Sequence, residues 1–476
     1  MDYANDYEDF GELAVKTLSE SCVEYGEARL RIEKVQALSI NTGELEPANL
    51  MIRKGIGIRA LVNGSLGFAS TNILEKDEVE ETALKSVKLA KASSHMTKAP
   101  ISLSFEDYFE TKWRTKVKED PQNVSVEDKV SLLQDLDKIA SGEGCPKRVL
   151  NISESIESTL FITTEGMKVS GEVTRVSFIG LLTAIGDSGS AQRIIQRGET
   201  SGWESIANWN LPDLIRREAG SLREVAECTA SSPVGSMDLI LGPEVVGIIC
   251  HEACGHPQEA DRILGREAAQ AGESYVTPEM LGFKIGSEAV TIIDDPTFER
   301  GFGSYSFDDE GVKARPRVLI KEGKINEFLQ NRETAPLFGC KSNASARAIG
   351  YDREPIIRMS NTYMKPGEHS FEELVGEVED GVFIKSFMEW NIDDRRWNQR
   401  YVGLEAFRIR KGEFEERIRD PVLEITTSSL FSCIDAASKE LEFEAAICGK
   451  GEPMQSAPVW HGGPTIRLRG VKITRR

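Results

Sequence analysis

The chain has 476 residues, of which 58 are Lys or Arg and 77 are Asp or Glu, so its formal net charge is −19. At about 150 residues per domain, this length predicts two or three domains. An acidic surface repels the phosphates of nucleic acids and anionic lipids, so neither is an expected partner. The first ten residues lack the basic and apolar parts of a secretory signal, and no apolar stretch has the length of a bilayer span. We therefore expect a cytoplasmic protein.

The cysteines and histidines limit the chemistry that the chain can perform. Hydrophobic residues make up 40% of the sequence, which is enough for a core that needs no disulfide or metal to fold. Eight cysteines are scattered without a CxxC pair, as is typical of core residues in a reducing compartment, unless one is a ligand or nucleophile. The five histidines are His95, His251, His256, His369 and His461.

The first hundred residues predict helices packed on strands. Residues 7–24 have a helical pattern, and two strand-like runs at 29–40 and 50–62 follow. Asn63-Gly64 tolerates positive φ at both positions and predicts a tight hairpin. Residues 76–94 place small and branched apolar side chains on one helical stripe, which favours a helix packed on a sheet.

Helix and strand signals continue to about residue 230. Ser125 and Asp128 form a pattern similar to a capping box at the start of a helix. Residues 148–203 read as strands with a turn at Glu165-Gly166, and residues 211–230 are helical again. The segment SSPVGSM that follows (231–237) predicts a break between domains.

The second half consists mostly of hairpins, for example around Glu322-Gly323 and Lys411-Gly412. The predicted fold class is therefore α+β. Residues 1–230 would form an N-terminal α/β domain of helices packed on a sheet. Residues 231–476 would form a β-rich, antiparallel, barrel-like C-terminal domain that carries the helix described next.

The segment His251-Glu252-Ala253-Cys254-Gly255-His256 is the most informative part of the sequence. It follows a helix start at Gly242-Pro243-Glu244. Two histidines beside a glutamate are typical of metallohydrolases with the H-E-x-x-H motif. Here the spacing is five, which places the imidazoles about 140° apart on an ideal helix. A shared metal therefore requires a π-bulge or a change of direction, and we predict a helix distortion near Gly255. The alternative is a pair of core histidines bonded to Glu259 and Asp261.

The stretch HEACGHPQEAD resembles the metal motif of the TldD/PmbA metalloprotease family, also called the modulator of DNA gyrase family. Other stretches are similar to that family in the same order along the chain. They are GIGIRALVNGSLGFAS, TIIDDPT, FDDEGVKARPRVLIKEGKINEFL, RMSNTYMKPG and AICGKGEPMQSAPVWHGGPTIRLRGVKI.

The resemblance implies a metal held by His251, His256 and the thiolate of Cys448, with Glu252 polarising the attacking water. It also implies hydrolysis of peptides that bind extended against strands of the C-terminal domain. PmbA-like subunits generally lack the histidine motif, so this chain resembles the active, TldD-like branch. Two imidazoles and a thiolate with one open position suit Zn²⁺, and we expect one ion per chain.

Other residues near the motif leave alternatives open. Spacing alone favours Cys254 over Cys448 as the third ligand, because Cys254 lies three residues after His251. His461 would be a substrate or metal contact, or an ordinary loop histidine. Glu259 and Asp261 would orient the imidazoles from behind or form a solvated helix face.

The stretch RMSNTYMKPG offers Arg358, Asn361 and Tyr363 as candidate substrate-binding residues, with a structural strand-turn as the alternative. The acid pairs 294–295 and 308–309 are interpreted as turn formers or ion-pair partners rather than a second metal site. Residues 387–407 depart from the family pattern, which affects the expected substrate preference and the cleft wall.

The predicted function is a zinc-dependent peptidase for unfolded or extended peptides. An assembly would shield its site, either a homodimer or a heterodimer with a PmbA-like subunit. One alternative is a non-catalytic, metal-containing binding protein, marked by four protein ligands and no open position. Another is a metallohydrolase of small amide conjugates.

Overall fold

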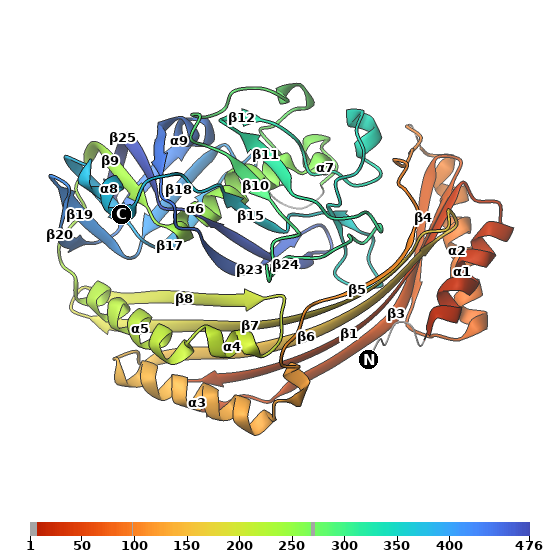
Figure 1. Cartoon of the computed structure of the whole chain (residues 1–476), viewed down its shortest axis with the longest axis horizontal. Helices are drawn as coiled ribbons and strands as arrows, with labels where there is room; N and C mark the ends of the chain where they lie inside the picture. The colour runs from red at the N-terminus through yellow and green to blue at the C-terminus, as the bar shows by residue number, and fades with distance from the viewer. Residues whose placement is uncertain (1–6, 98, 268–271) are drawn as a thin grey trace.

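The computed structural model describes residues 7–97, 99–267 and 272–476. Its N-terminal part is built on one curved, mostly antiparallel sheet in the order β4-β3-β1-β6-β7-β5, with β2 paired to β1 and β8 to β7 (Figure 1). The strands are β1 (Tyr25–Asn41), β2 (Glu44–Leu45), β3 (Asn49–Val62), β4 (Ser65–Thr71), β5 (Glu110–Arg114), β6 (Lys147–Thr163), β7 (Lys168–Gly186) and β8 (Gly189–Glu199).

Local turn chemistry explains how these strands connect. At the predicted hairpin between β3 and β4, Asn63 has a φ of 51° and Gly64 a φ of 67°, as a turn with two left-handed residues requires. The turn from β6 to β7 occurs at the predicted Glu165-Gly166. Burial alternates along β6 because successive side chains point to opposite faces of the sheet. One face packs against helices, and the other faces the C-terminal part of the chain.

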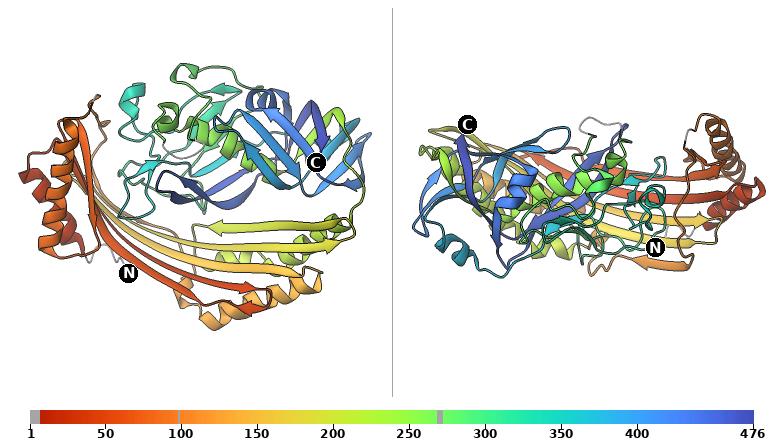
Figure 2. Two further views of the ribbon diagram at one scale, coloured as in Figure 1. Left: turned by 180° about the vertical axis from the view of Figure 1, so that it is seen from behind. Right: turned by 90° about the horizontal axis from the view of Figure 1, so that it is seen from above.

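Helices cover the convex face of this sheet at its two ends (Figures 1 and 2). The structure confirms the helix at 76–94 and the cap at Ser125, whose Oγ accepts a hydrogen bond of 3.0 Å from the backbone N–H of Asp128. The helices are α1 (Glu8–Glu20), α2 (Lys76–Ser94), η2 (Pro121–Asn123), α3 (Val126–Gly142), α4 (Glu204–Asn208) and α5 (Leu211–Glu227). Their apolar stripes fill two separate cores, one below each end of the sheet.

The C-terminal part contains a six-stranded sheet (β12-β11-β10-β15-β24-β23), a curled nine-stranded sheet (β17-β18-β21-β25-β9-β16-β19-β20, with β22 on β25) and the pair β13–β14. The strands are β9 (Gly235–Leu241), β10 (Ile292–Asp294), β11 (Arg317–Lys321), β12 (Lys324–Ile325), β13 (Ala346–Arg347), β14 (Ile356–Ile357), β15 (Asn361–Met364), β16 (Asp380–Ile384), β17 (Phe387–Ile392), β18 (Asn398–Gly403), β19 (Ala406–Arg410), β20 (Glu413–Ile418), β21 (Pro421–Thr426), β22 (Ile434–Ala437), β23 (Glu442–Lys450), β24 (Gln455–Gly463) and β25 (Ile466–Arg475).

Short helices connect these strands, and the largest hydrophobic core surrounds the first of them, α6. They are α6 (Pro243–Ile249), η3 (Cys250–Gly255), η4 (His256–Gln258), α7 (Ala260–Ile263), η5 (Pro278–Met280), η6 (Ala335–Phe338), α8 (Phe371–Gly376) and α9 (Thr427–Cys433). The predicted hairpins at Glu322-Gly323 and Lys411-Gly412 are present. Strands β9–β16 and β15–β24 pair in parallel within otherwise antiparallel sheets. The α+β fold class is thus confirmed.

The C-terminal part sits on the concave face of the N-terminal sheet (Figure 2). Buried ion pairs join the two parts, among them Arg59 with Glu310 at 2.8 Å and Arg31 with Asp309. Residues 228–234 link the two parts. This link lies close to the expected domain boundary after residue 230, and that boundary stays a prediction. Within the described ranges, no helix is both long enough and apolar enough to cross a membrane.

Candidate metal centre

A π-helical segment brings the two motif histidines together. Helix α6 continues without a break into η3, where the helix widens to π geometry, and then tightens into η4. Because π-helical hydrogen bonds join residues five apart, His251 and His256 lie on one side, with ring centroids 4.8 Å apart. The predicted distortion near Gly255 is therefore confirmed. Gly255 has no room for a side chain, since a Cβ atom there would lie 1.8 Å from Sδ of Met359.

Strand β23 supplies the third donor atom. Sγ of Cys448 lies 3.2 Å from Nε2 of His251 and 3.3 Å from Nε2 of His256. The candidate ligand atoms of the three residues all lie within 4.8 Å of one another, and all three side chains are buried. The structure thus brings together the three residues that the family resemblance implies as ligands.

The charges around Cys448 favour its thiolate. Burial raises the pKa of this thiol, but its interaction with His256, which is within hydrogen-bond distance, and the charge of Arg358 lower the pKa by more, so that it falls to about 7. Burial lowers the pKa of His251, and it lowers that of His256 to about 4. Two neutral imidazoles beside a thiolate form the donor set that Zn²⁺ prefers. The residues present therefore fit a zinc ion.

Glu259 orients one of the imidazoles. Nδ1–H of His256 donates to its carboxylate over 3.0 Å, which leaves Nε2 facing Cys448. Glu259 is buried, and Arg262 and Lys450 approach it at 2.7 Å and 3.2 Å. Burial raises the pKa of Glu259, but Lys450, His256 and Arg262 together hold it well below its usual value. Such a carboxylate behind a ligating histidine fixes the tautomer and the ring orientation.

Glu252 is buried beside His251 and forms an ion pair with Arg396. Arg396 lies in the turn between β17 and β18, inside the segment that departs from the family pattern. The turn is packed against the centre, because the Trp397 ring lies 5.3 Å from the ring of Tyr275, whose hydroxyl donates to the carbonyl of Ala253. The sequence analysis missed Arg396, since 144 residues separate it from Glu252 and no spacing relates them.

The other sulfur and imidazole groups lie around the three donors. Burial raises the pKa of both Cys250 and Cys254, which fits packing residues. In the described part of the chain, Cys254 does not belong to the group of converging donor atoms. The ring of His461 lies 6.0 Å from that of His251, and burial, followed by the charge of His251, lowers its pKa to about 3.

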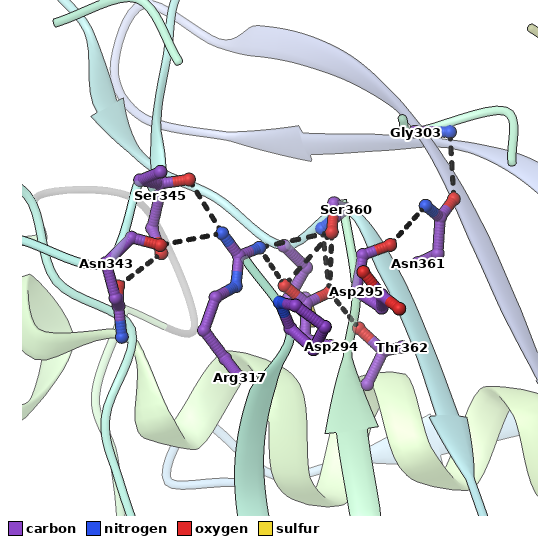
Figure 3. A network of polar contacts seen from close by, with 12 residues as sticks. Asp294, Asp295, Gly303, Arg317, Asn343, Ser345, Ser360, Asn361 and Thr362 are labelled. Atoms are coloured by element: carbon purple, nitrogen blue, oxygen red, sulfur yellow. Dashed lines mark hydrogen bonds and ion pairs between the residues drawn. The ribbon is translucent and has the colours of Figure 1, made fainter. Parts of the chain in front are cut away.

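The stretch RMSNTYMKPG is largely engaged in internal contacts. Asn361 donates to the carbonyl of Asp295 and accepts from the N–H of Gly303 (Figure 3). It also donates to Oγ of Ser304. The Tyr363 ring packs in an aromatic cluster with Phe298 and Phe443. These contacts favour the structural alternative for both residues.

Arg358 is buried and donates to the backbone carbonyls of Gln455 and Cys448. It therefore fixes the strand that carries the third donor, and it remains a candidate for substrate contact.

Acids of both pairs, 294–295 and 308–309, make ion pairs or hydrogen bonds within the protein, as the sequence analysis expects. Asp294 is fully buried, pairs with Arg317, and accepts hydrogen bonds from Ser360 and Thr362 (Figure 3). Asp308 accepts three backbone N–H bonds, and the neighbouring Asp309 pairs with Arg31.

Three sequence models of one family match the chain. The PmbA/TldA metallopeptidase domain 1 matches residues 26–90, the central domain residues 119–227 and the C-terminal domain residues 234–475. A metalloprotease of Methanothermobacter thermautotrophicus is 32% identical over 456 residues, which is 95% of this chain and 96% of that protein. A zinc metalloprotease TldD homologue of Saccharolobus solfataricus is 32% identical over 253 residues, 53% of this chain and 54% of its own.

Solved structures share the fold. A candidate modulator of DNA gyrase from Thermotoga maritima superposes with a TM-score of 0.79 at 18% identity and covers 98% of this chain and 100% of its own. TldE from Thermococcus kodakarensis gives a TM-score of 0.72 at 19% identity, with 98% and 99% covered. The matches to all three domains, together with the converging histidines and cysteine, show that the chain belongs to the PmbA/TldD metallopeptidase family.

Proposed function

We propose that this protein is a zinc-dependent peptidase that hydrolyses unfolded or extended peptides. The observation that carries the proposal is the convergence of three buried donors, two imidazole nitrogens from His251 and His256 and the sulfur of Cys448, beside the carboxylate of Glu252. The names of the relatives, metalloprotease and zinc metalloprotease, support the same reading. One zinc ion per chain, held by these residues, would supply Lewis-acid chemistry that polarises a peptide carbonyl and acidifies water.

The side chains of the protein have separate tasks in this proposal. Glu252 takes a proton from the attacking water and passes it to the leaving amine as a general base and acid. Arg396 holds that carboxylate in one orientation and balances its charge in the buried site. Glu259 keeps the His256 imidazole in the tautomer whose Nε2 faces Cys448.

The substrate would bind extended against the strands that flank Cys448, because β23 is an edge strand of its sheet. We further propose a cytoplasmic dimer, either of two such chains or with a PmbA-like subunit, that encloses the site. The similarity of the fold to TldE is consistent with such related subunits.

The alternatives differ in observable ways. A binding protein with a structural metal would use four protein ligands, whereas three donors converge in the described ranges. A hydrolase of small amide conjugates would share the three donors but would not prefer long peptides.

Digestion of an unstructured peptide library, read by mass spectrometry, tests the proposal. Wild type would be compared with Glu252→Gln and with the exposed control Glu80→Gln, with the zinc content of each measured. We expect cleavage by wild type and the control, and a loss of at least about 100-fold in Glu252→Gln at unchanged zinc content. Zinc-loaded wild type that cleaves no peptide, either alone or together with a PmbA-like subunit, would contradict a peptidase. Peptides of two, five and ten residues distinguish a peptidase from a hydrolase of small amides.

A further inference from the structure

A cavity of about 440 Å³ lies between the concave face of the N-terminal sheet and strands β23 and β24. Alternate residues of β6 and β7 form its floor, and its sides combine apolar and aromatic side chains with carboxylates and guanidinium groups. Residues that shape it include Trp113, Phe161, Phe302, Tyr305, Phe307 and Pro458. Its volume lies in the range of sites that hold small molecules or a few residues of a peptide.

Two guanidinium groups enter this cavity without an ion-pair partner. Arg175 and Arg347 are each only 8% exposed. Nε–H of Arg175 donates to the carbonyl of Phe302 over 3.0 Å, and Nη1–H of Arg347 donates to the carbonyls of Met359 and Pro458. Among the described residues, no carboxylate lies within ion-pair distance of either group. Glu157 and Asp309 act on these groups only from beyond ion-pair distance, and the guanidinium carbon of Arg347 lies 5.5 Å from the centre of the Tyr305 ring. A buried charge without a direct ion-pair partner can accept an added anion.

The carboxylates in the cavity wall already have other partners. Glu157 lies 3.5 Å from Arg31, which also pairs with Asp309. Glu33 faces Arg53 at 3.9 Å. Asp308, as described above, is held by backbone N–H groups. The guanidinium groups of Arg175 and Arg347 therefore remain open to an incoming anion.

The cavity and the metal donors lie on opposite faces of the same strand. Ile447 and its partner across the hairpin, Pro458, line the cavity, whereas Cys448, the next residue of β23, does not line it and points to the other face. Arg358 lines the cavity and also donates to the carbonyl of Cys448. A group bound in the cavity would thus be separated from the donor atoms by the thickness of strand β23.

We infer that this cavity is an anchoring site for a carboxylate of the peptide substrate, held by Arg175 and Arg347 with an apolar portion against the aromatic wall. Guanidinium groups match carboxylates in charge and planar geometry. The carboxylate comes either from the C-terminus of the peptide or from an acidic side chain. The inference rests on the proposed function, since it names the class of peptide that the site would select.

Binding to a non-cleaving protein tests the inference separately from catalysis. The zinc-loaded Glu252→Gln protein would be titrated with three fluorescent decapeptides that share one sequence with a single Asp. One has a free C-terminus, one has an amidated C-terminus, and one has a free C-terminus with that Asp replaced by Asn. We expect removal of the recognised carboxylate to weaken binding by about 10- to 100-fold, as for hydrogen bonds to charged groups. The peptide that weakens identifies the source of the carboxylate.

Substitutions place the effect in the cavity. Arg175→Met and Arg347→Met, each combined with Glu252→Gln, should remove the difference between the peptides, while the exposed control Arg114→Met keeps it. Arg→Lys variants serve if the Met variants do not fold, and we expect them to reduce the difference because Lys cannot bind bidentately. Equal binding of all three peptides, or discrimination that survives in the cavity variants, would overturn the inference. Carboxylate-dependent binding without cleavage by wild type would leave the inference standing and contradict the proposed peptidase.

Discussion

Glu252 and Arg396 form a buried ion pair in which each residue depends on the other. Arg396 has a φ of 61°, and Oγ1–H of Thr427 donates to its carbonyl, so its backbone is held in a left-handed conformation. Its side chain is 9% exposed and that of Glu252 is 7% exposed. Removing one partner of such a pair leaves a charge without compensation inside the protein.

We predict that Arg396→Met lowers the free energy of unfolding by about 3–5 kcal/mol. We also expect kcat to fall by up to about 100-fold, because the carboxylate of Glu252 loses its fixed orientation. Urea unfolding and kcat with KM on a library peptide measure the two effects, and Arg396→Lys should recover part of both. The control is the neighbouring Arg395→Met, whose exposed pair with Glu273 contributes at most about 1 kcal/mol. Equal effects of the two Met variants would contradict the assigned role.

We expect His461 to make the stability of the protein sensitive to acid. Its pKa is lowered to about 3 in the folded protein, whereas that of an unfolded histidine is about 6.5. The unfolded chain therefore binds more protons between these values, so the stabilisation is complete above pH 6.5 and is lost as the pH falls toward 3.

We predict that, between pH 7.5 and pH 4.5, the free energy of unfolding of wild type falls by up to about 2–3 kcal/mol more than that of His461→Gln. Urea unfolding at both pH values measures the difference. His95→Gln, a substitution of an exposed histidine, should lose as much as wild type. A His461→Gln protein with the same loss as wild type would refute the buried, neutral imidazole.

At the scale of the element, the π-helical turn depends on the absence of a side chain at Gly255. We predict that Gly255→Ala displaces the turn against Met359, lowers stability by about 1–3 kcal/mol and reduces zinc content. Metal analysis and thermal unfolding measure the two effects. The matched control is Gly142→Ala at the end of α3, where a Cβ meets nothing within 4 Å. Met359→Ala should partly rescue Gly255→Ala, and a failure of the control to bind zinc would count against this explanation.

The elements that sequence predicts best are those whose signals are local. The Asn63-Gly64 hairpin, the Ser125 cap and the distortion near Gly255 each follow from a few adjacent residues. Cys448 is different, because spacing favours Cys254 and only the family resemblance points to the distant cysteine. Arg396 could not be predicted at all, since its position depends on how a hairpin packs against the π-helical turn.

At the scale of the whole molecule, buried charges hold the two parts together. Arg59 of the N-terminal sheet pairs with Glu310, which also accepts a hydrogen bond of 2.7 Å from the backbone N–H of Arg332. Arg59 also pairs with Glu27, at 2.9 Å, within the N-terminal sheet. Such contacts between distant segments explain why the arrangement of the parts, and the cavity between them, were not predictable from sequence.

We predict that Glu310→Ala lowers the free energy of unfolding by about 3–5 kcal/mol and makes the link at 228–234 more susceptible to proteolysis. Urea unfolding and limited proteolysis with mapping of the fragments measure these effects. Glu80→Ala, which removes an exposed glutamate, should change neither. A Glu310→Ala protein as stable as wild type would show that the two parts associate mainly through apolar contacts.

Cys448 comes 192 positions after His256, and these positions also determine when the donor set is completed during translation. At about 5–20 residues per second, the ribosome needs roughly 10 to 40 seconds to add them. Until β23 and its neighbour β24 have been made, a nascent chain holds two imidazoles and no thiolate partner. Products of interrupted translation that end before Cys448 therefore lack the third donor atom, so the order of synthesis itself delays a complete donor set until β23 has been made.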